Sequence, residues 1–498
     1  SPGTGNVTFD LRDANNTVDT SAVNVIVSRV TGPSSSLING RLSIEQDGGT
    51  PVPDLFLINP NGITFGENAD LSLLPGSLIT STAESVLFNG GLEFGAANPG
   101  AAPLLTVSTP VGLQMGRTSG EIHINNTGHD LTAFRRNPIT VGATPTGLQI
   151  NANSTLAMVG RNVSLAGGIL SATDGHTNLG AVSAPDTVAL TASTSGWQLD
   201  YSDVSQFGDV TLSQQSLVDV GDIGSATLQG QNIYLQDGSV IFQENNTSQT
   251  AGRLQLQAIN SIDMQGRSPN ALRSGVISDT RNDGQGGDIL LSAPQILGSN
   301  SGMGIRSFTY GAGQGGNITM NATEIDMIGG SSAGALVELR ALGSGDGGKL
   351  SIMTATLRMI DAGLINNVNN GTGNAGSIDI NASESMTVGP NNRLSTLIGS
   401  SSVSANGNAG EINITTTRFT LAGGALISSS TYGAGDAGKI TINASEQITV
   451  TGEGRNIATN TVEPAQLRTA GILLSSAFRA FLRLPDNVTG SSGDIVLN

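Results

Sequence analysis

The sequence predicts an all-β protein folded as a right-handed parallel β-helix (β-solenoid), with about one three-sided coil per repeat of roughly 30 residues. Three observations support this fold class: a glycine-led repeat, alternation of apolar residues within each copy, and an unusual composition. The 498 residues include 68 Gly, and 37% are apolar, whereas 3% are aromatic and 12% are charged. This composition supports a packed core and disfavours disorder and ordinary helical or α/β enzymes.

Each copy of the repeat begins with a small residue and a glycine, followed one residue later by an apolar-x-apolar pair. The glycines that mark successive copies are Gly252, Gly287, Gly316, Gly348, Gly376, Gly410, Gly438 and Gly493. The first seven lie 28 to 35 residues apart, and the final interval of 55 predicts one degenerate copy. Because alternation at period two marks a strand with one buried face, three such strands per copy predict stacked coils.

Two positions in the repeat predict how adjacent coils meet. The polar position after the first strand is expected to form side-chain ladders. It holds Asn321, Asn381 and Asn443, and in other copies Ser292, Thr415 and Gln257. Glycine pairs such as Gly315-Gly316 and Gly347-Gly348 are expected at corners that require positive φ.

The rhythm of the repeat predicts a division of the chain into three regions. These are an N-terminal domain of different organisation, a less regular β-helix and a Gly-rich repeat β-helix, over residues 1–120, 121–250 and 251–498. An insert near 195–222 contains the single Trp, Trp197, with Tyr201 and Phe207. In a chain so poor in aromatics, this Trp is interpreted as covering a core defect rather than as part of a binding bump.

The N-terminal region carries the most specific motif, a turn between two apolar strands. It consists of Asn59, Pro60, Asn61, Gly62 and Ile63. Pro fixes φ and Asn-Gly supplies a tight turn. Four further segments flank this motif, two before it and two after it: Val23–Gly32, Ile38–Gly40, Ser81–Ala83 and Phe88–Phe94. Together they resemble the N-terminal domain of the filamentous haemagglutinin family, in its cyanobacterial branch.

This resemblance implies a β-helical secretion domain with Asn59–Ile63 as its secretion motif, recognised by an outer-membrane transporter in two-partner secretion. It also implies a secreted, extracellular protein of the cell surface: an adhesin-like solenoid that attaches to cells, surfaces or matrix, with glycans or other cell surfaces as partners. A second asparagine-proline turn and an aromatic stretch, which the family carries upstream, are missing. Together with the absence of an initial Met and of a signal-peptide pattern, this predicts a processed or N-terminally truncated chain.

Charge and cysteine content exclude several classes of partner and site. With 22 Lys+Arg and 39 Asp+Glu, the net charge of −17 disfavours nucleic acid and anionic membranes as partners. The chain has no Cys, which excludes disulfides and zinc–thiolate sites. No apolar run approaches the roughly 20 residues that cross a bilayer, so no membrane insertion is expected.

Neither catalytic residues nor a cofactor are expected. His123, His129 and His176 lack metal-ligand spacing and are interpreted as solvated surface residues. No nucleophile-elbow sequence supports a hydrolase triad. A β-helical polysaccharide lyase or hydrolase would need aligned carboxylates beside Arg or Lys. Arg358, Asp361 and Asp379 are available, but neighbouring copies are not acidic at the equivalent positions.

Two alternatives stay open at the corners and at the end of the chain. Acidic corner loops could hold calcium, as in Asp283–Asp288, Asp346–Gly348 and Asp436–Gly438. The acids recur too irregularly for a tandem calcium repeat, so solvated turns are preferred and metal binding is unknown. The chain ends in phase on Ile495–Asn498, which suggests either a longer protein cut at this point or, as an alternative function, a subunit that stacks head to tail in an extracellular filament.

Overall fold

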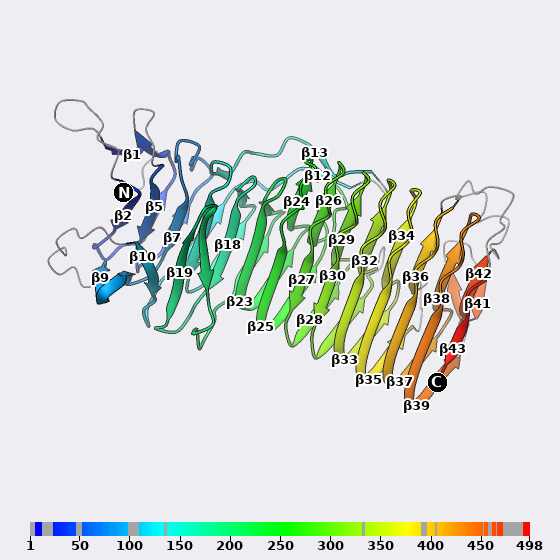
Figure 1. The fold of residues 1–498 in the computed structure, drawn as a ribbon. Helices are drawn as coiled ribbons and strands as arrows, with labels where there is room; N and C mark the ends of the chain where they lie inside the picture. Colours follow the sequence, from blue (N-terminus) through cyan, green and yellow to red (C-terminus); the bar gives the residue numbers. More distant parts are fainter. Residues whose placement is uncertain are drawn as a thin grey trace.

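The computed structural model is a rod of stacked coils, with the blue N-terminal strands at one end and the red C-terminal strands at the other (Figure 1). It describes residues 5–11, 23–45, 52–97, 109–133, 137–330, 334–389, 396–403, 406–451 and 492–498, and the backbone of three strands between 453 and 471. Neighbouring coils pair through parallel strands. The predicted all-β parallel solenoid is therefore confirmed.

Two large parallel sheets form the sides of the rod. The first has 21 strands: β2 (Val25–Arg29), β3 (Ser36–Ile38), β5 (Asp54–Ile58), β6 (Ile63–Phe65), β7 (Leu78–Ser81), β11 (Ile122–Asn125), β15 (Thr155–Gly160), β16 (Val163–Ala166), β18 (His176–Ala181), β21 (Val210–Ser213), β23 (Ser225–Gln236), β25 (Leu254–Gln265), β27 (Ile289–Ser292), β28 (Gln295–Ser299), β30 (Ile318–Asn321), β31 (Glu324–Ile328), β33 (Leu350–Ile360), β35 (Ile378–Val388), β37 (Ile412–Ala422), β39 (Ile440–Thr451) and β43 (Ile495–Leu497). The second has 11 strands: β14 (Leu148–Gln149), β17 (Ile169–Ser171), β22 (Leu217–Asp219), β24 (Val240–Asn245), β26 (Gly275–Thr280), β29 (Gly304–Thr309), β32 (Leu336–Ala341), β34 (Leu364–Asn369), β36 (Leu397–Ser402), β38 (Leu426–Thr431) and β42 (Gln466–Gly471).

Three sides follow from the pairing of these strands. The consecutive strands β27, β28 and β29 form one coil, the first two in the 21-stranded sheet and the third in the 11-stranded sheet. The long strand β33 pairs with both β30 and β31, so it continues across two sides. A register shift between Thr354 and Thr356 in its pairing with β35 breaks the ladder at the bend between these sides.

The core consists of columns of identical or similar apolar residues. One column is formed by successive register partners, each at most 1% exposed: Ile289, Ile318, Leu350, Ile378, Ile412 and Ile440. Burying each such side chain contributes about 1.5 to 3 kcal/mol relative to exposure. One coil cannot enclose this column alone, so the stability of each coil depends on its neighbours.

The glycine corners have a different physical cause from the one expected. None of Gly315, Gly316, Gly347 and Gly348 has a positive φ, so that expectation is wrong. Instead, a Cβ on Gly348 would lie 2.1 Å from the carbonyl oxygen of Gly316 in the preceding coil. Glycine is required there because the backbones of adjacent coils approach too closely for any side chain.

The predicted polar position is aligned from coil to coil, but it does not form one continuous amide ladder. Ser292, Asn321, Met353, Asn381, Thr415 and Asn443 are successive register partners. Met353, which is 51% exposed, separates two of the asparagines. At the last described coil, Asn498 Nδ2 donates a hydrogen bond to Asn443 Oδ1 at 2.7 Å.

A five-stranded antiparallel sheet covers the N-terminal part of the rod. Its strands are β8 (Ser85–Phe88), β9 (Leu92–Gly95), β10 (Pro110–Gln114), β19 (Thr187–Ser193) and β20 (Gly196–Asp200), with a 3₁₀ turn η2 (Asn89–Gly91). Three smaller pairs are β1 (Val7–Asp10) with β4 (Leu42–Glu45), β12 (Leu131–Thr132) with β13 (Thr140–Val141), and β40 (Glu453–Asn456) with β41 (Thr461–Pro464). The antiparallel sheet was not predicted from the sequence.

Trp197 lies in this sheet and confirms the packing interpretation. Its ring is 3% exposed and meets Phe56 edge-on, with centroids 5.0 Å apart and an interplanar angle of 87°. Its Nε1 donates to Asp54 Oδ2 at 2.8 Å, which satisfies the buried indole N–H. Of the proposed insert, only β20 belongs to this sheet, because β21 and β22 are strands of the coils.

Candidate functional site

The predicted secretion motif is a buried turn that ties two parts of the chain together. Asn59 has no exposed surface, and its Nδ2 donates to Ser36 Oγ at 2.8 Å and to Ser34 O at 3.1 Å. Its Oδ1 accepts from the backbone N–H of Asn61 at 3.0 Å, an Asx turn. Gly62 has φ of 111°, which favours glycine at this position.

The remaining motif residues divide into an anchored and an accessible part. Ile63 is fully buried in the core, whereas Asn61 is exposed and Pro60 is half-buried. The Pro60 carbonyl accepts from the N–H of Gly120 at 2.7 Å. A Cβ on Gly120 would lie 2.5 Å from the nitrogen of Gly62, so this segment packs tightly on the turn. Within the motif, Pro60 and Asn61 are therefore the most accessible residues.

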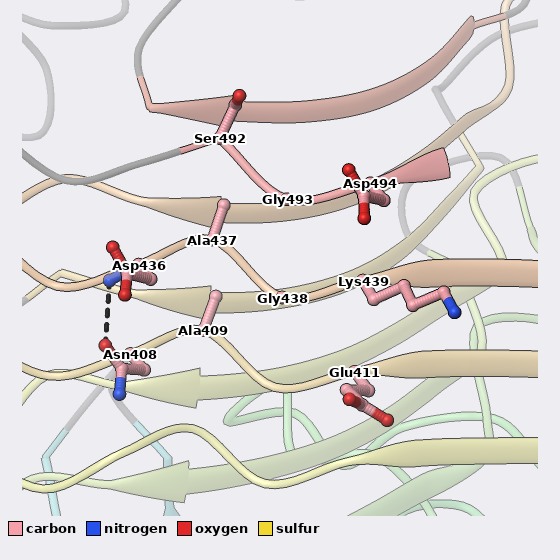
Figure 2. Close-up of a pocket in the computed structure, with 10 residues that line it drawn as sticks. All are labelled: Asn408, Ala409, Glu411, Asp436, Ala437, Gly438, Lys439, Ser492, Gly493 and Asp494. Atoms are coloured by element: carbon pink, nitrogen blue, oxygen red, sulfur yellow. Dashed lines mark hydrogen bonds between the residues drawn. The ribbon is translucent and has the colours of Figure 1, made fainter. Parts of the chain in front are cut away.

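A shallow groove runs along the glycine corner near the C-terminal end of the rod (Figure 2). Its volume is about 360 Å³. The groove is lined by the same repeat positions in consecutive coils: Asn408 and Asp436; Ala409, Ala437 and Ser492; Gly438 and Gly493; Glu411, Lys439 and Asp494. Small residues form its floor, and charged and amide side chains form its flanks.

A ladder of polar side chains runs along the glycine corner, and its last two members, Asn408 and Asp436, line the groove. Asp346 Oδ1 accepts from the N–H of Asn374 at 2.7 Å, and Asn374 Oδ1 accepts from the N–H of Asn408 at 3.0 Å. Asn408 Oδ1 accepts in turn from the N–H of Asp436 at 2.7 Å, the dashed line in Figure 2. Each of these residues stands two positions before a repeat glycine, so the spacing of the repeat could have revealed the ladder.

In the acidic corner loops, several Asp carboxylates accept hydrogen bonds from the next coil in the same way. Asp283 accepts from the N–H of Ala312 at 2.8 Å, and Asp288 accepts from both the backbone and the side chain of Asn317 at 3.0 and 3.1 Å. Within the described ranges, no three His, Asp or Glu side chains are grouped as metal ligands. These bonds fit the preferred interpretation as turns, and the calcium alternative is not tested by them.

The histidines do not all lie at the solvated surface, so that interpretation is wrong for His129. Its side chain is 3% exposed and hydrogen-bonded to the carbonyl of Gly238 at 2.9 Å. His176 is half-buried, and burial lowers its pKa. It contacts Ser225 Oγ at 2.5 Å and Ser195 Oγ at 3.1 Å.

His123 lies between Glu121 Oε2 at 3.3 Å and Ser164 Oγ at 2.6 Å. This order of groups resembles a nucleophilic triad, but the His123 and Glu121 side chains are 42% and 44% exposed. Water competes strongly at such exposure, and a hydrolase needs a positioned substrate pocket and oxyanion donors in addition. The contact is accounted for by cross-strand pairing, because His123 and Ser164 are register partners.

The residues considered for a lyase are not assembled into one site. Arg358 binds Asp326 in the preceding coil through two hydrogen bonds of 2.9 and 2.8 Å. Asp379 instead binds Lys349 Nζ at 2.6 Å and Asn413 Nδ2 at 2.9 Å. Asp361 lies at a turn with φ of 49°. These side chains form pairs between coils rather than a cluster of aligned carboxylates.

Comparison with known proteins identifies the N-terminal part of the chain. Residues 2–234 match the family model described as the TPS secretion domain. This match extends past residue 120 and includes the five-stranded sheet. No curated protein matches the sequence. Within the described ranges, no helix is long and apolar enough to span a membrane.

Proposed function

Because residues 2–234 of this chain belong to the TPS secretion domain family, we propose that the rod, once secreted, attaches its producer to cells, surfaces or matrix. A TPS domain interacts with an outer-membrane transporter during secretion, and the chain is a secreted exoprotein of the haemagglutinin type. The family match concerns secretion, and attachment is the additional role that we propose. It is supported by the repeated polar surface of the glycine corner.

The corner groove suits hydroxyl-rich partners such as neutral glycans. Its floor is formed by alanines and glycines, and its flanks carry amide and carboxylate acceptors together with the ammonium group of Lys439. Neutral sugars bind through many such hydrogen bonds, each of modest net free energy. Because the corner recurs along the rod, weak contacts in several coils add through effective concentration.

The test replaces two exposed groove residues in the full chain, Glu411→Ala and Lys439→Ala together. The matched control is Arg418→Ala with Glu446→Ala, an exposed ion pair of 2.7 Å on another side of the same two coils. Both double variants leave the net charge unchanged. Retention of protein-coated beads is measured under flow on intact bacterial cells and on cellulose, mannan and dextran surfaces.

We expect the wild-type chain and the control to be retained, and retention of the groove variant to fall at least about tenfold. Equal retention of the two variants would remove the groove from the proposal. Failure of the wild-type chain to bind any of these surfaces would contradict the attachment function itself. Circular dichroism of each variant checks that the rod is intact.

A further inference from the structure

A hairpin from the N-terminal part of the chain lies across the outside of the rod. We call residues 126–133 and 137–147 the strap hairpin; residues 134–136 between them lie outside the described residues. Its strands β12 and β13 pair antiparallel, with Leu131 opposite Val141. In Figure 1 the strap hairpin lies beside β24 and β26 of the 11-stranded sheet, and the contacts below establish this placement.

The first anchor of the strap hairpin is His129. Its Nδ1 accepts from the N–H of Leu131 at 3.1 Å, so the proton of the neutral ring is on Nε2. That Nε2–H donates to the carbonyl oxygen of Gly238 at 2.9 Å. The backbone N–H of His129 donates to the carbonyl of Gln215, also at 2.9 Å. The side chain therefore uses both ring nitrogens to hold the strap hairpin on the coils.

The second anchor is an apolar cluster on the outer face of the 11-stranded sheet. Leu131 and Ile139 of the strap hairpin are each 1% exposed. They cluster with outward residues of four successive coils: Ile169, Leu217, Val240, Phe242, Leu272 and Ile277. Without the strap hairpin, this apolar surface would face water. Burying Leu131 and Ile139 away from water therefore stabilises the docked strap hairpin.

The third anchor lies further along the rod. Arg306 Nη2 donates to the carbonyl of Asn137 at 3.0 Å, and Arg281 Nη2 donates to that of Ile139 at 3.3 Å. The N–H of Ile139 donates to Asp279 Oδ2 at 3.4 Å. These contacts hold Asn137 and Ile139 on β26 and β29.

These anchors are far from the strap hairpin in sequence. His129 and Gly238 are 109 residues apart, and Asn137 and Arg306 are 169 residues apart. The TPS secretion domain match ends at residue 234, so Gly238, Asp279 and Arg306 all come after it. The strap hairpin thus belongs to the secretion domain by sequence and to the downstream coils by contact.

We propose that the strap hairpin is a late-closing clasp, which docks only after the coils through Arg306 have formed and then holds the secretion domain on the downstream rod. Contacts at this sequence separation carry a large loop-closure cost and need a preformed surface. The order of docking rests on these contacts alone.

Pulsed hydrogen exchange during refolding of the full chain tests the order of docking. Peptides covering 126–133 and 137–147 are compared by mass spectrometry with peptides from β15 to β18 and from β26 to β29. We expect the strap peptides to gain protection after both sets of coil peptides. Protection of the strap peptides before or together with β26 to β29 would overturn the proposal.

Native-state exchange provides a second test that does not depend on folding order. Leu131→Ser with Ile139→Ser is expected to speed exchange in the strap peptides at least about tenfold, with no change in β15 to β18. The control is Val141→Ser, because Val141 lies on the same hairpin but is 57% exposed. Equal exchange in both variants, or a general loss of protection in all peptides, would contradict a separate clasp.

Acidification supplies a third measurement on the unmodified chain. Burial lowers the pKa of His129 below its ordinary value of 6.5, and the hydrogen bond to Gly238 and the attraction of the neighbouring Asp130 only partly oppose this. On acidification, His129 therefore binds a proton at a higher pH in the undocked strap hairpin than in the docked one. As a result, the docked state loses stability as the pH falls below 6.5. Strap exchange, corrected for the intrinsic rate, should rise between pH 7.5 and 5.5. Unchanged exchange would exclude His129 as an anchor.

Discussion

Gly376→Ala is expected to lower the stability of the repeat region by about 3 kcal/mol. A Cβ at this position would lie 1.9 Å from the carbonyl oxygen of Gly348 in the preceding coil. The backbone has little freedom to move away, because Asn367 Nδ2 holds the Gly348 carbonyl at 2.7 Å and Ser400 Oγ holds the Gly376 carbonyl at 3.2 Å. The new methyl group must therefore separate two stacked coils.

Urea denaturation followed by circular dichroism measures this effect as a shift of the unfolding midpoint. The matched control is Gly399→Ala in the same coil, where the nearest atom to the new Cβ is the side-chain Asn366 Oδ1 at 3.2 Å. The control is expected to change stability by less than about 1 kcal/mol. Similar midpoints for the two variants would show that the glycine corners are not packed as described.

Arg306→Leu is expected to cost about 3 to 5 kcal/mol, because it leaves a buried carboxylate without its partner. Asp279 has no exposed surface, and the Arg306 guanidinium donates to its two oxygens at 2.9 and 2.7 Å. The same guanidinium donates to Tyr310 at 2.7 Å and stacks 3.8 Å above the Phe308 ring centre. No other described contact of Asp279 brings a positive charge into this position.

The pH dependence of the Arg306→Leu variant identifies the cause of the loss. Burial raises the pKa of Asp279, and Arg306 opposes this rise. Without Arg306, the Asp279 carboxyl stays protonated to a higher pH in the folded state than in the unfolded state. The loss of unfolding free energy relative to wild type should therefore be small near pH 4 and grow as the pH rises toward 8.

A double variant separates charge burial from packing. Arg306→Leu combined with Asp279→Leu removes both charges and should recover most of the lost stability, since replacing a buried ion pair by apolar residues is often nearly neutral. Unfolding midpoints of the single and double variants in urea provide the comparison. A double variant as unstable as Arg306→Leu, or a deficit independent of pH, would contradict the unpaired-charge explanation.

Much of the rod could be predicted from the sequence because the pattern that specifies each coil is local and recurs in every repeat. Alternating residues such as Ile378 and Ile380 indicate a buried face, and the glycine spacing gives the coil length. The register then follows: Ser292 and Asn321 were expected at equivalent positions, and they are register partners. The turn at Asn59 is likewise local, since its residues are adjacent in the chain.

The features that were not predicted from the sequence depend on partners far apart in the chain. Strand β10 pairs with β19, where Gly112 faces Ala189, and the strap hairpin reaches Arg306. Alternation shows that a strand has a buried face but not which distant segment covers it. For the same reason His129 was misassigned, because its anchor Gly238 cannot be inferred from the residues around it. The polar ladder was missed because Asp346 and Asn374 differ in residue type.

The most direct test of the account concerns the in-register stacking of coils, from which the corner groove is built. The chain has no Cys, so any disulfide that forms in a variant comes from the two introduced cysteines. Ser401 and Ser430 are register partners in adjacent coils, and parallel strands lie about 4.8 Å apart, within the range that a disulfide spans. Ser428 instead pairs with Gly399, which places it diagonally from Ser401.

The measurement is the fraction of disulfide formed under mild oxidation in two full-length variants, analysed by mass spectrometry after proteolysis. Ser401→Cys with Ser430→Cys is predicted to close nearly completely, whereas Ser401→Cys with Ser428→Cys should stay largely reduced. Equal yields, or a higher yield for the second pair, would contradict the register and with it the groove that the repeated coils build.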